Sequence, residues 1–382
     1  MYRTHTCGEL RPNHAGQTVT LAGWVNRRRD HGGVVFFDLR DRSGLVQVTI
    51  NPDLPKDILD LVEDIRMEWV LQIEGEVQNR PEGMANPKMA TGEIEIIAKN
   101  VKILNPSKSL PFVVSSDADL PDENTRLKYR YLDLRRERLT RNMILRHKVI
   151  KFMRDYLDKE GFIEIETPIM FKATPEGARD YLVPSRIHPG QVYALPQSPQ
   201  QLKQLLMVAG MDKYFQIARC FRDEDLRGDR QPEFTQLDLE MSYVHRDDVL
   251  DLVENLYTKM LPVVAPHKKL LSSPWLRFSY LEVMDKYGTD KPDLRFGMAL
   301  IDVSDIFSKS EFRVFQSTLE AGGVIKCIIA PGSAGMSRKE VDKLTDVAKS
   351  FGAKGMPYLA VTDEGVKGSV AKFVKEEEVE TL

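Results

Sequence analysis

Strand-like runs of apolar residues fill the N-terminal part of the chain. Three such runs, TVTLAGWVNRRR, VVFFDLRD and GLVQVTINP, are separated by the turn signals DHGG and DRSG. A short helix pattern, DLPKDILDLVEDI, and two more runs, WVLQIEGEV and EIEIIAKNVKIL, come next. Three strands, a helix and two strands are the order of an OB-fold barrel, which commonly binds oligonucleotides across its second and third strands. We therefore predict an OB-fold β-barrel over residues 1–105.

A stretch rich in Ser, Pro and Asp, NPSKSLPFVVSSDADLPDE, follows this β unit, and the strongly basic LKYRYLDLRRERLTRN continues it. Such a composition is typical of a connector between domains. We expect a linker or hinge over residues 106–135, with most of its charges in solvent.

Helical and strand-like patterns then alternate over residues 136–296. Apolar residues at helical spacing, ended by Gly161, predict a long helix: Leu139, Met143, Ile150, Met153 and Leu157. FIEIETPIM predicts a strand stopped by Pro168, and YALPQSPQQLKQLLMVAG predicts a strand and a helix with Ser198 as its N-cap. KYFQIARCF and EFTQLDLEMSYV predict two further strands. Helices between antiparallel strands favour an α+β domain.

The pattern changes again at about Gly297. IDVSDIF, GGVIKCIIAPGSA, a helix over residues 337–351 and PYLAVTDEG predict a separate small α/β module over residues 297–382. The whole chain is thus expected to be an α+β multidomain protein.

The stretch FRDEDLRGDRQPEFTQLDLE places many charges between two otherwise apolar strands. Gln236, Asp238 and Glu240 share one face of the second strand, and Arg222 and Glu224 share a face of the first. A row of polar groups on a central strand is costly unless something binds there. A fixed arginine suits a phosphate, and nearby acids suit an ammonium or a phosphate-bound Mg²⁺. The stretch predicts a site for a nucleotide and an amine, with an ion-paired sheet facing solvent as the alternative.

Composition limits the class of protein. The 382 residues carry a net charge of -3, with 29% charged and 42% hydrophobic residues, which is typical of a soluble globular protein of two or three domains. No apolar run is long enough to span a bilayer, and the start, MYRTHTCGEL, lacks the apolar core of a signal peptide. The cysteines have no zinc-like or redox-like spacing, so we expect reduced thiols in a cytoplasmic protein, and no metal site: Cys7, Cys220 and Cys327.

Several segments resemble those of class II aminoacyl-tRNA synthetases. FRDEDLRGDRQPEFTQLDLE is similar to their motif 2, and GFIEIETPIM is similar to their motif 1, which builds the dimer. ATPEGARDYLVPSR and ALPQSPQQLKQLL resemble the aspartate-specific segments, and GWVNRRRDHGGVVFFDLRDRSGLVQV resembles the anticodon-binding barrel of the bacterial aspartyl-tRNA synthetases. The resemblance runs from residue 2 to the end of the chain. It implies an OB-fold anticodon-binding domain, a class II catalytic domain with an antiparallel sheet, and an inserted α/β domain.

The resemblance implies an aspartate–tRNA ligase. Such an enzyme uses ATP with Mg²⁺ to convert L-aspartate to aspartyl-adenylate, and transfers the aspartyl group to the 3′ end of tRNA-Asp. Arg222 would hold the α-phosphate of ATP and the aspartate carboxylate, and Glu224 and Gln231 would contact ATP. The segment that ends near Pro168 would form the interface of a homodimer.

The same resemblance assigns residues to the amino acid. Lys203, with Gln200, would bind the side-chain carboxylate of aspartate, an anion that asparagine lacks. Glu176, in a loop expected to close over the site, would bind the substrate ammonium together with Gln236 and Asp238. From the residues alone, Lys203 could equally be the exposed face of its helix, and Glu176 a simple loop charge.

In the barrel, the resemblance implies that Phe36 stacks on an anticodon base and that Arg29 and Gln47 bind base edges. Only one phenylalanine of VVFFDL can face outward, so barrel core is the alternative for Phe36. The loop with His31 and the turn with Gly83 resemble the non-discriminating subgroup, which charges both tRNA-Asp and tRNA-Asn. A few hinge arginines are expected to face tRNA.

Motif 3 of the family, a Gly-rich strand and helix with an arginine for the γ-phosphate, does not occur in this sequence. We therefore expect the catalytic and inserted domains to be incomplete and residues 1–382 alone to be inactive, as in a fragment truncated before motif 3. Two alternatives remain open: an asparaginyl- or lysyl-tRNA synthetase, and a non-catalytic tRNA-binding protein.

Overall fold

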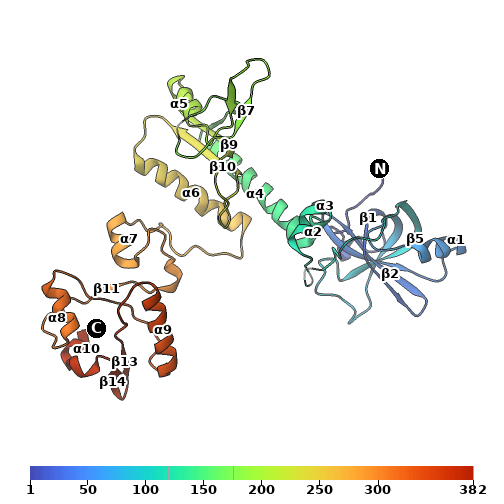
Figure 1. Ribbon diagram of the computed structural model, residues 1–382. Coiled ribbons are helices and arrows are strands. Elements are labelled where there is room, and N and C mark those ends of the chain that lie inside the picture. The colour runs from blue at the N-terminus through green and yellow to red at the C-terminus, as the bar shows by residue number, and fades with distance from the viewer. Residues whose placement is uncertain (117, 119, 175, 382) are drawn as a thin grey trace. The chain divides into compact units, whose positions relative to one another are not determined.

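The computed structural model describes residues 1–116, 118, 120–174 and 176–381 (Figure 1). The chain divides into two compact units, Met1–Val249 and Leu250–Leu382. The domain boundaries predicted from the sequence remain predictions.

A closed barrel forms the N-terminal part of the first unit, shown in blue in Figure 1. Its strands are β1 (Thr18–His31), β2 (Val34–Asp41), β3 (Gly44–Ile50), β4 (Val70–Asn79) and β5 (Ile94–Asn105), with α1 (Lys56–Asp64) between β3 and β4. Around the barrel they follow the order β1-β2-β3-β5-β4. A short 3₁₀ helix, η1 (Pro12–His14), precedes β1. The predicted OB-fold order is confirmed.

Strand alternation decides which phenylalanine of β2 belongs to the barrel core. Phe37 and Leu39 are fully buried, whereas Phe36 and Asp38 are only partly buried because they lie on the opposite side of the strand. Phe36 is therefore available on the outer face of the barrel.

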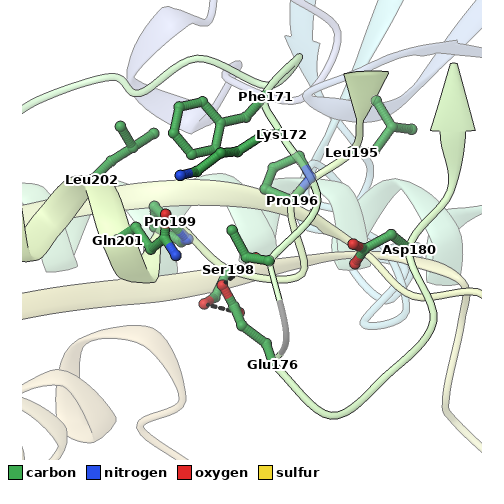
Figure 2. Close-up of a pocket in the computed structure, with 11 residues that line it drawn as sticks. Phe171, Lys172, Glu176, Asp180, Leu195, Pro196, Ser198, Pro199, Gln201 and Leu202 are labelled. Carbon is green, nitrogen blue, oxygen red and sulfur yellow. Dashed lines mark hydrogen bonds between the residues drawn. The ribbon is translucent and has the colours of Figure 1, made fainter. Parts of the chain in front are cut away.

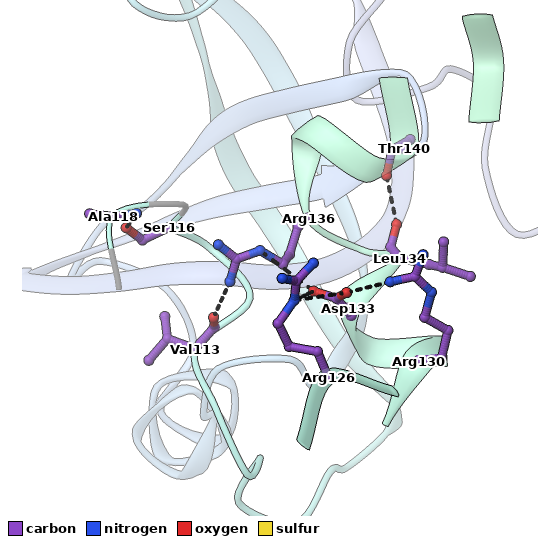
Figure 3. A network of polar contacts seen from close by, with 9 residues as sticks. All are labelled: Val113, Ser116, Ala118, Arg126, Arg130, Asp133, Leu134, Arg136 and Thr140. Carbon is purple, nitrogen blue, oxygen red and sulfur yellow. Dashed lines mark hydrogen bonds and ion pairs between the residues drawn. The ribbon is translucent and has the colours of Figure 1, made fainter. Parts of the chain in front are cut away.

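The hinge contains a buried ionic network (Figure 3). The hinge segment forms two short helices, α2 (Glu123–Lys128) and α3 (Arg130–Asp133). The side chains of Asp133 and Arg136 are almost completely buried. The carboxylate of Asp133 lies 3.3 Å from Nε of Arg126, 2.8 Å from Nη1 of Arg130 and 3.8 Å from Nε of Arg136. Arg136 also donates to the carbonyl oxygen of Val113 at 3.3 Å. Most charges of the basic stretch were expected to lie in solvent; Asp133 and Arg136 are exceptions, because pairing allows both to be buried.

A second ionic contact joins the hinge to the barrel. Glu68, which is buried, accepts hydrogen bonds from Arg40 of β2 at 2.7 Å and from Arg135 at 2.8 Å. The guanidinium of Arg135 lies 5.1 Å from the ring centroid of Trp24. The barrel and the hinge thus share charged and aromatic partners.

A small sheet follows the long helix α4 (Glu137–Lys159). Its strands are β6 (Ile163–Glu164), β9 (Lys213–Phe221) and β10 (Glu233–Met241) in the order β10-β9-β6, with β9 and β10 antiparallel. The hairpin β7 (Leu182–Pro184) and β8 (Val192–Ala194) and the helix α5 (Gln200–Val208) lie between β6 and β9 in the chain.

The predicted long helix is confirmed as α4, although its buried residues all lie in its C-terminal half and Met143 is exposed. Two other local predictions for this region need correction. The strand expected to run to Pro168 ends at Glu164. Ser198 is not the N-cap of α5; that position is Pro199, and Ser198 bonds to another loop instead.

The second unit contains most of α6 (Arg246–Val264) and several short elements: α7 (Tyr280–Tyr287), η2 (Leu294–Phe296), β11 (Ile301–Asp302), α8 (Arg313–Glu320), β12 (Lys326–Cys327), α9 (Arg338–Ser350), β13 (Leu359–Thr362), β14 (Gly365–Gly368), η3 (Ala371–Phe373) and α10 (Glu376–Thr381). Val303, Phe307 and Ile325 form its core. Ser337 precedes α9, as predicted, and its hydroxyl and backbone N–H both donate to Glu340.

Candidate functional site

The polar face of β10 meets one helix. Asp238 lies opposite Gln216 of β9 in the strand register, and Glu240 lies opposite Tyr214. The ammonium of Lys203, on α5, donates to Oδ1 of Asp238 at 2.9 Å and lies 3.3 Å from Oε2 of Glu240. The structure therefore brings together residues that the sequence placed 35 positions apart.

This contact is shielded from solvent. Only 12% of the Lys203 side chain and 11% of the Asp238 side chain are exposed. Burial acts to lower the pKa of Lys203, but the hydrogen bond and charge of Asp238, with those of Glu240, outweigh it and raise the pKa. Burial raises the pKa of Asp238, and Lys203 opposes that rise. Oδ2 of Asp238 is buried and has no hydrogen-bond partner among the residues that the structure describes.

Arg222 lies just beyond the end of β9, not on the strand as the sequence analysis expected, because the ladder ends at Phe221. Its backbone N–H donates to the carbonyl oxygen of Pro232 at 2.9 Å, and its guanidinium lies 5.1 Å from the ring centroid of Phe234. Within the described part of the chain, its buried Nε has no hydrogen-bond partner. Such a donor can bind an anion.

The other two residues expected to bind ATP also lie outside the strands. Glu224 and Gln231 are exposed in the connection between β9 and β10. The same connection therefore carries Arg222, Glu224 and Gln231, but the structure does not bring the latter two to the guanidinium.

Cys220, a residue that the sequence analysis did not include in the site, lies on β9 beside the polar face of β10. Its fully buried thiol donates to Oε1 of Gln236 at 3.1 Å. Burial raises the pKa of the thiol to about 11, and the charge of Asp238 acts in the same direction. The charge of Arg222 acts to lower this pKa, and that of Glu176 acts to raise it. The side-chain contact of Cys220 is with Gln236, which lies on the same face of β10 as Asp238.

Glu176 is held by two hydroxyl groups. Thr174 donates to one of its carboxylate oxygens at 3.0 Å and Ser198 donates to the other at 2.7 Å. Thr174, Glu176 and Ser198 line a small hollow together with Lys172 and Asp180 (Figure 2). Neither Arg222 nor Lys203 lines this hollow, so it adjoins the predicted aspartate site through Glu176 and Ser198 and is not that site itself. Gln200 is the first residue of α5, one turn before Lys203.

A polar cluster covers the outer face of the barrel. Arg29 donates to Asp38 at 2.7 Å and to Gln47 at 3.1 Å, and its guanidinium lies 5.8 Å from the centroid of the Phe36 ring. Gln47 donates in turn to Glu95 of β5 at 3.0 Å. The predicted residues Arg29, Phe36 and Gln47 are thus adjacent. The sequence analysis did not include Asp38 and Glu95 in this cluster. Asp38 belongs to it because it lies opposite Gln47 in the register of β2 and β3.

The remaining barrel residues lie in turns or have structural partners. His31 ends β1 and is exposed, and Gly83 has a φ of 78° in the connection between β4 and β5. Arg28 has a structural role, because its guanidinium donates to the carbonyl oxygens of Val62, Glu63 and Ile65 at the end of α1.

Metal clusters and membrane-spanning helices are both absent from the described residues. No group of three or more His, Cys, Asp or Glu side chains there could hold a metal ion. Among the described helices, none has the length and apolarity that crossing a membrane requires.

Comparisons with known proteins agree with this architecture. The sequence model of the family described as tRNA synthetases class II (D, K and N) matches residues 122–374, and that of the OB-fold nucleic acid binding domain matches residues 19–104. Among solved structures, an asparaginyl-tRNA synthetase from Pyrococcus horikoshii complexed with asparaginyl-adenylate has a TM-score of 0.65. That likeness covers 78% of this chain and 71% of the other at 22% identity, and it concerns the fold alone.

Two curated relatives carry the name aspartate–tRNA(Asp/Asn) ligase. The chain is 54% identical over 381 residues to the one from Rubrobacter xylanophilus and 53% identical over 380 residues to the one from Heliobacterium modesticaldum. All of this chain is matched, but it spans only 63% and 62% of the lengths of these relatives. The predicted family and fold class are confirmed. The chain belongs to the class II tRNA synthetases of the aspartate, lysine and asparagine group.

Proposed function

We propose that this protein activates L-aspartate with ATP and transfers the aspartyl group to tRNA-Asp. The observation that carries the proposal is the largely buried pair of Lys203 and Asp238, with the more exposed Glu240 beside it. An ammonium and a carboxylate oxygen without a partner in the described structure, side by side, suit a ligand that has both charges. Aspartate has a side-chain carboxylate for Lys203 and an ammonium for Asp238. The names of the two relatives from Rubrobacter and Heliobacterium support this substrate.

In the first step, an oxygen of the aspartate α-carboxylate attacks the α-phosphorus of ATP. The bond from this phosphorus to the bridging oxygen breaks, and pyrophosphate leaves with the electron pair. Arg222 would bind the α-phosphate and stabilise the negative charge that develops on it, because its buried Nε has no partner in the described structure. Glu224 and Gln231 would contact the nucleotide from the same connection.

The amino acid would be held by residues of α5 and β10. Lys203, with Gln200, would bind the side-chain carboxylate, and Asp238, with Gln236, would bind the ammonium. Glu176 would join them when it exchanges its hydroxyl partners for the substrate. These groups act by orientation and electrostatics, which is the main source of catalysis when phosphorus is attacked in line.

Mg²⁺ would accompany ATP. Because no three-ligand cluster is present among the described residues, the ion would be held mostly by phosphates and water, as Mg²⁺ at nucleotide sites commonly is. When bound, it would neutralise charge on the phosphates, and Glu224 offers an exposed carboxylate for it.

In the second step, a hydroxyl group at the 3′ end of the tRNA attacks the carbonyl carbon of aspartyl-adenylate, and AMP leaves. The barrel would select the tRNA: Phe36 would stack on an anticodon base while Arg29 and Gln47 bind base edges. The contacts of Arg29 with Gln47 and Phe36 support this role, because they orient the three side chains before RNA binds.

We further propose that tRNA-Asn is a substrate, as the relatives' shared name suggests for those proteins. His31 and Gly83, both in exposed turns of the barrel, would permit the third anticodon base of either tRNA. Aminoacylation of purified tRNA-Asn checks this, and absence of aspartyl-tRNA-Asn would reject it.

A homodimer is also proposed. Apolar side chains around Pro168 are exposed in the single chain, which supports an interface there: Ile163, Ile169 and Met170. Sedimentation of the protein at several concentrations tests the oligomeric state.

The experiment that tests the function is aspartate-dependent exchange of pyrophosphate into ATP by the full-length gene product. We expect exchange with aspartate and not with asparagine or lysine, and a loss of about 100-fold or more for Lys203→Met. Exchange with asparagine or lysine in place of aspartate would favour one of the related synthetases. Specific tRNA binding without exchange with any amino acid would favour a non-catalytic tRNA-binding protein.

A further inference from the structure

Gln197 makes an unusual set of hydrogen bonds just before α5. Its side chain is almost completely buried, with 2% of the residue exposed. Oε1 accepts from the backbone N–H of Ala178 at 3.0 Å, and Nε2 donates to the carbonyl oxygen of Ala178 at 2.9 Å and to Oδ1 of Asp180 at 2.5 Å. One side-chain amide thus pairs both backbone groups of a residue in the loop that follows Glu176.

The orientation of this amide is fixed by its partners. A backbone N–H can only donate and a carbonyl oxygen can only accept, so Oε1 must face the first and Nε2 the second. Asp180 adds a charged acceptor on the Nε2 side, and a hydrogen bond to a charged group is stronger than a neutral one. Gln197 therefore holds Ala178 as a neighbouring strand would.

The residues next to Gln197 hold the two parts of the proposed site. Ser198 donates to Glu176 at 2.7 Å. The carbonyl oxygen of Pro196 accepts from the backbone N–H of Phe221 at 2.9 Å, at the end of β9. On the other side of the clamp, the carbonyl oxygen of Arg179 accepts from the backbone N–H of Asp223 at 3.0 Å.

These hydrogen bonds hold the residues on either side of Arg222. Phe221 is bonded to the segment that carries Gln197, and Asp223 is bonded to the segment that Gln197 clamps. The backbone position of Arg222 therefore depends on the distance between the two segments, as does the position of Glu176.

We propose that Gln197 is a positioning residue for aspartate activation, which sets Glu176 and Arg222 relative to each other through its clamp on Ala178. This inference rests on the proposed function. Gln197 itself contacts no substrate in this account, and it acts only through Glu176 and Arg222.

Two single variants of Gln197, one double variant and one control test this inference. Gln197→Met keeps the size of the side chain and removes all three hydrogen bonds. Gln197→Glu keeps the acceptor for Ala178 but sets a carboxylate against Asp180, and adding Asp180→Asn replaces that repulsion by a donor. Asp180→Asn alone is the matched control, because the oxygen of the introduced amide still accepts from Gln197.

The first readout needs no substrate. In the 382-residue chain, the backbone amide of Ala178 should exchange its hydrogen at least about tenfold faster in Gln197→Met than in the wild type, because its acceptor is gone. Amides in β9 and β10 should keep their wild-type exchange rates. Faster exchange throughout β9 and β10 would show general destabilisation and overturn the proposal.

The second readout is pyrophosphate exchange by the full-length gene product. Gln197→Met and Gln197→Glu should each lower kcat/KM for aspartate by about tenfold or more, mainly through KM, with Asp180→Asn within about twofold of wild type. The Gln197→Glu/Asp180→Asn variant should recover part of the loss. Wild-type kinetics in the Gln197 variants would overturn this inference and leave the proposed function intact, whereas an inactive wild type would refute both.

Discussion

Removal of the Lys203 ammonium gives the most informative test of the cluster on β10. Lys203→Met keeps most of the apolar stem and deletes the charge that lies 2.9 Å from Asp238 and 3.3 Å from Glu240. Asp238 would then be a buried carboxylate with one oxygen that already has no partner in the described structure. Glu240 is more exposed and can turn to solvent.

Two energies bound the stability that Lys203→Met should lose. Breaking a buried ion pair costs about 3–5 kcal/mol, because the remaining charge is left without compensation. Asp238 can instead take up a proton, and at pH 7 this costs at most about 4 kcal/mol for a carboxyl group whose ordinary pKa is 3.8. Since both side chains are about a tenth exposed, we expect Lys203→Met to lower the opening free energy of this sheet by about 2–4 kcal/mol.

The loss should depend on pH with a definite sign. Burial already raises the pKa of Asp238, and removing Lys203 raises it further. A carboxyl group whose pKa is higher in the folded state binds a proton that the unfolded state releases, so stability is present at low pH and lost as pH rises through the folded pKa. The penalty of Lys203→Met should therefore be small near pH 4 and grow towards pH 7, by up to about 1.4 kcal/mol per pH unit.

Native-state hydrogen exchange of amides in β9 and β10 is the suitable assay. The chain has three tryptophans, Trp24, Trp69 and Trp275, and none lies in this sheet, so tryptophan fluorescence would not report on it.

Two further variants serve as controls in that assay. Lys151→Met, which breaks the exposed pair with Asp155, should cost less than about 1 kcal/mol. Lys203→Met/Asp238→Asn should cost less than Lys203→Met alone, because it removes the uncompensated charge. A loss below about 0.5 kcal/mol for Lys203→Met, or one independent of pH, would refute this reasoning.

Other predictions concern the barrel and the hinge. Phe36→Ala should weaken binding of an anticodon stem-loop about 10–100-fold in fluorescence anisotropy, by loss of stacking worth about 1–3 kcal/mol, and unchanged affinity would contradict the stacking role. Phe37→Ala should instead destabilise the barrel by about 3–5 kcal/mol in urea unfolding, because Phe37 is fully buried. Asp133→Asn should lower the unfolding temperature of the hinge and barrel, since it removes the buried carboxylate that pairs with Arg126, Arg130 and Arg136; an unchanged temperature would show that the network is energetically neutral.

The barrel was predictable because its strands are runs of β-branched and aromatic residues and the first two turns contain Gly. The observed strands β2 and β3 begin at the expected residues, and the parity of β2 alone assigns Phe37 to the core and Phe36 to the surface. The same parity placed Gln236, Asp238 and Glu240 on one face. Local sequence pattern carries this information because side chains of a strand alternate regardless of what packs on them.

The burial of charged groups was not predictable from composition. The basic stretch before α4 has the composition of a solvated linker, yet Asp133 and Arg136 are both buried within a network of charged contacts. The end of β9 was misplaced because no Gly or Pro directly follows Phe221, and Arg222 continues the alternating pattern in sequence while leaving the ladder in space. Gln197 gives no sequence signal at all, since its role depends on a loop that precedes it by nearly twenty residues.

A crystal structure of the full-length gene product with a non-hydrolysable sulfamoyl analogue of aspartyl-adenylate tests the site most directly. Its side-chain carboxylate should lie about 3 Å from Nζ of Lys203, with the guanidinium of Arg222 on the sulfamoyl group that stands in for the α-phosphate. An analogue bound with its side chain away from Lys203, or with Arg222 facing a different surface, would contradict the proposed site.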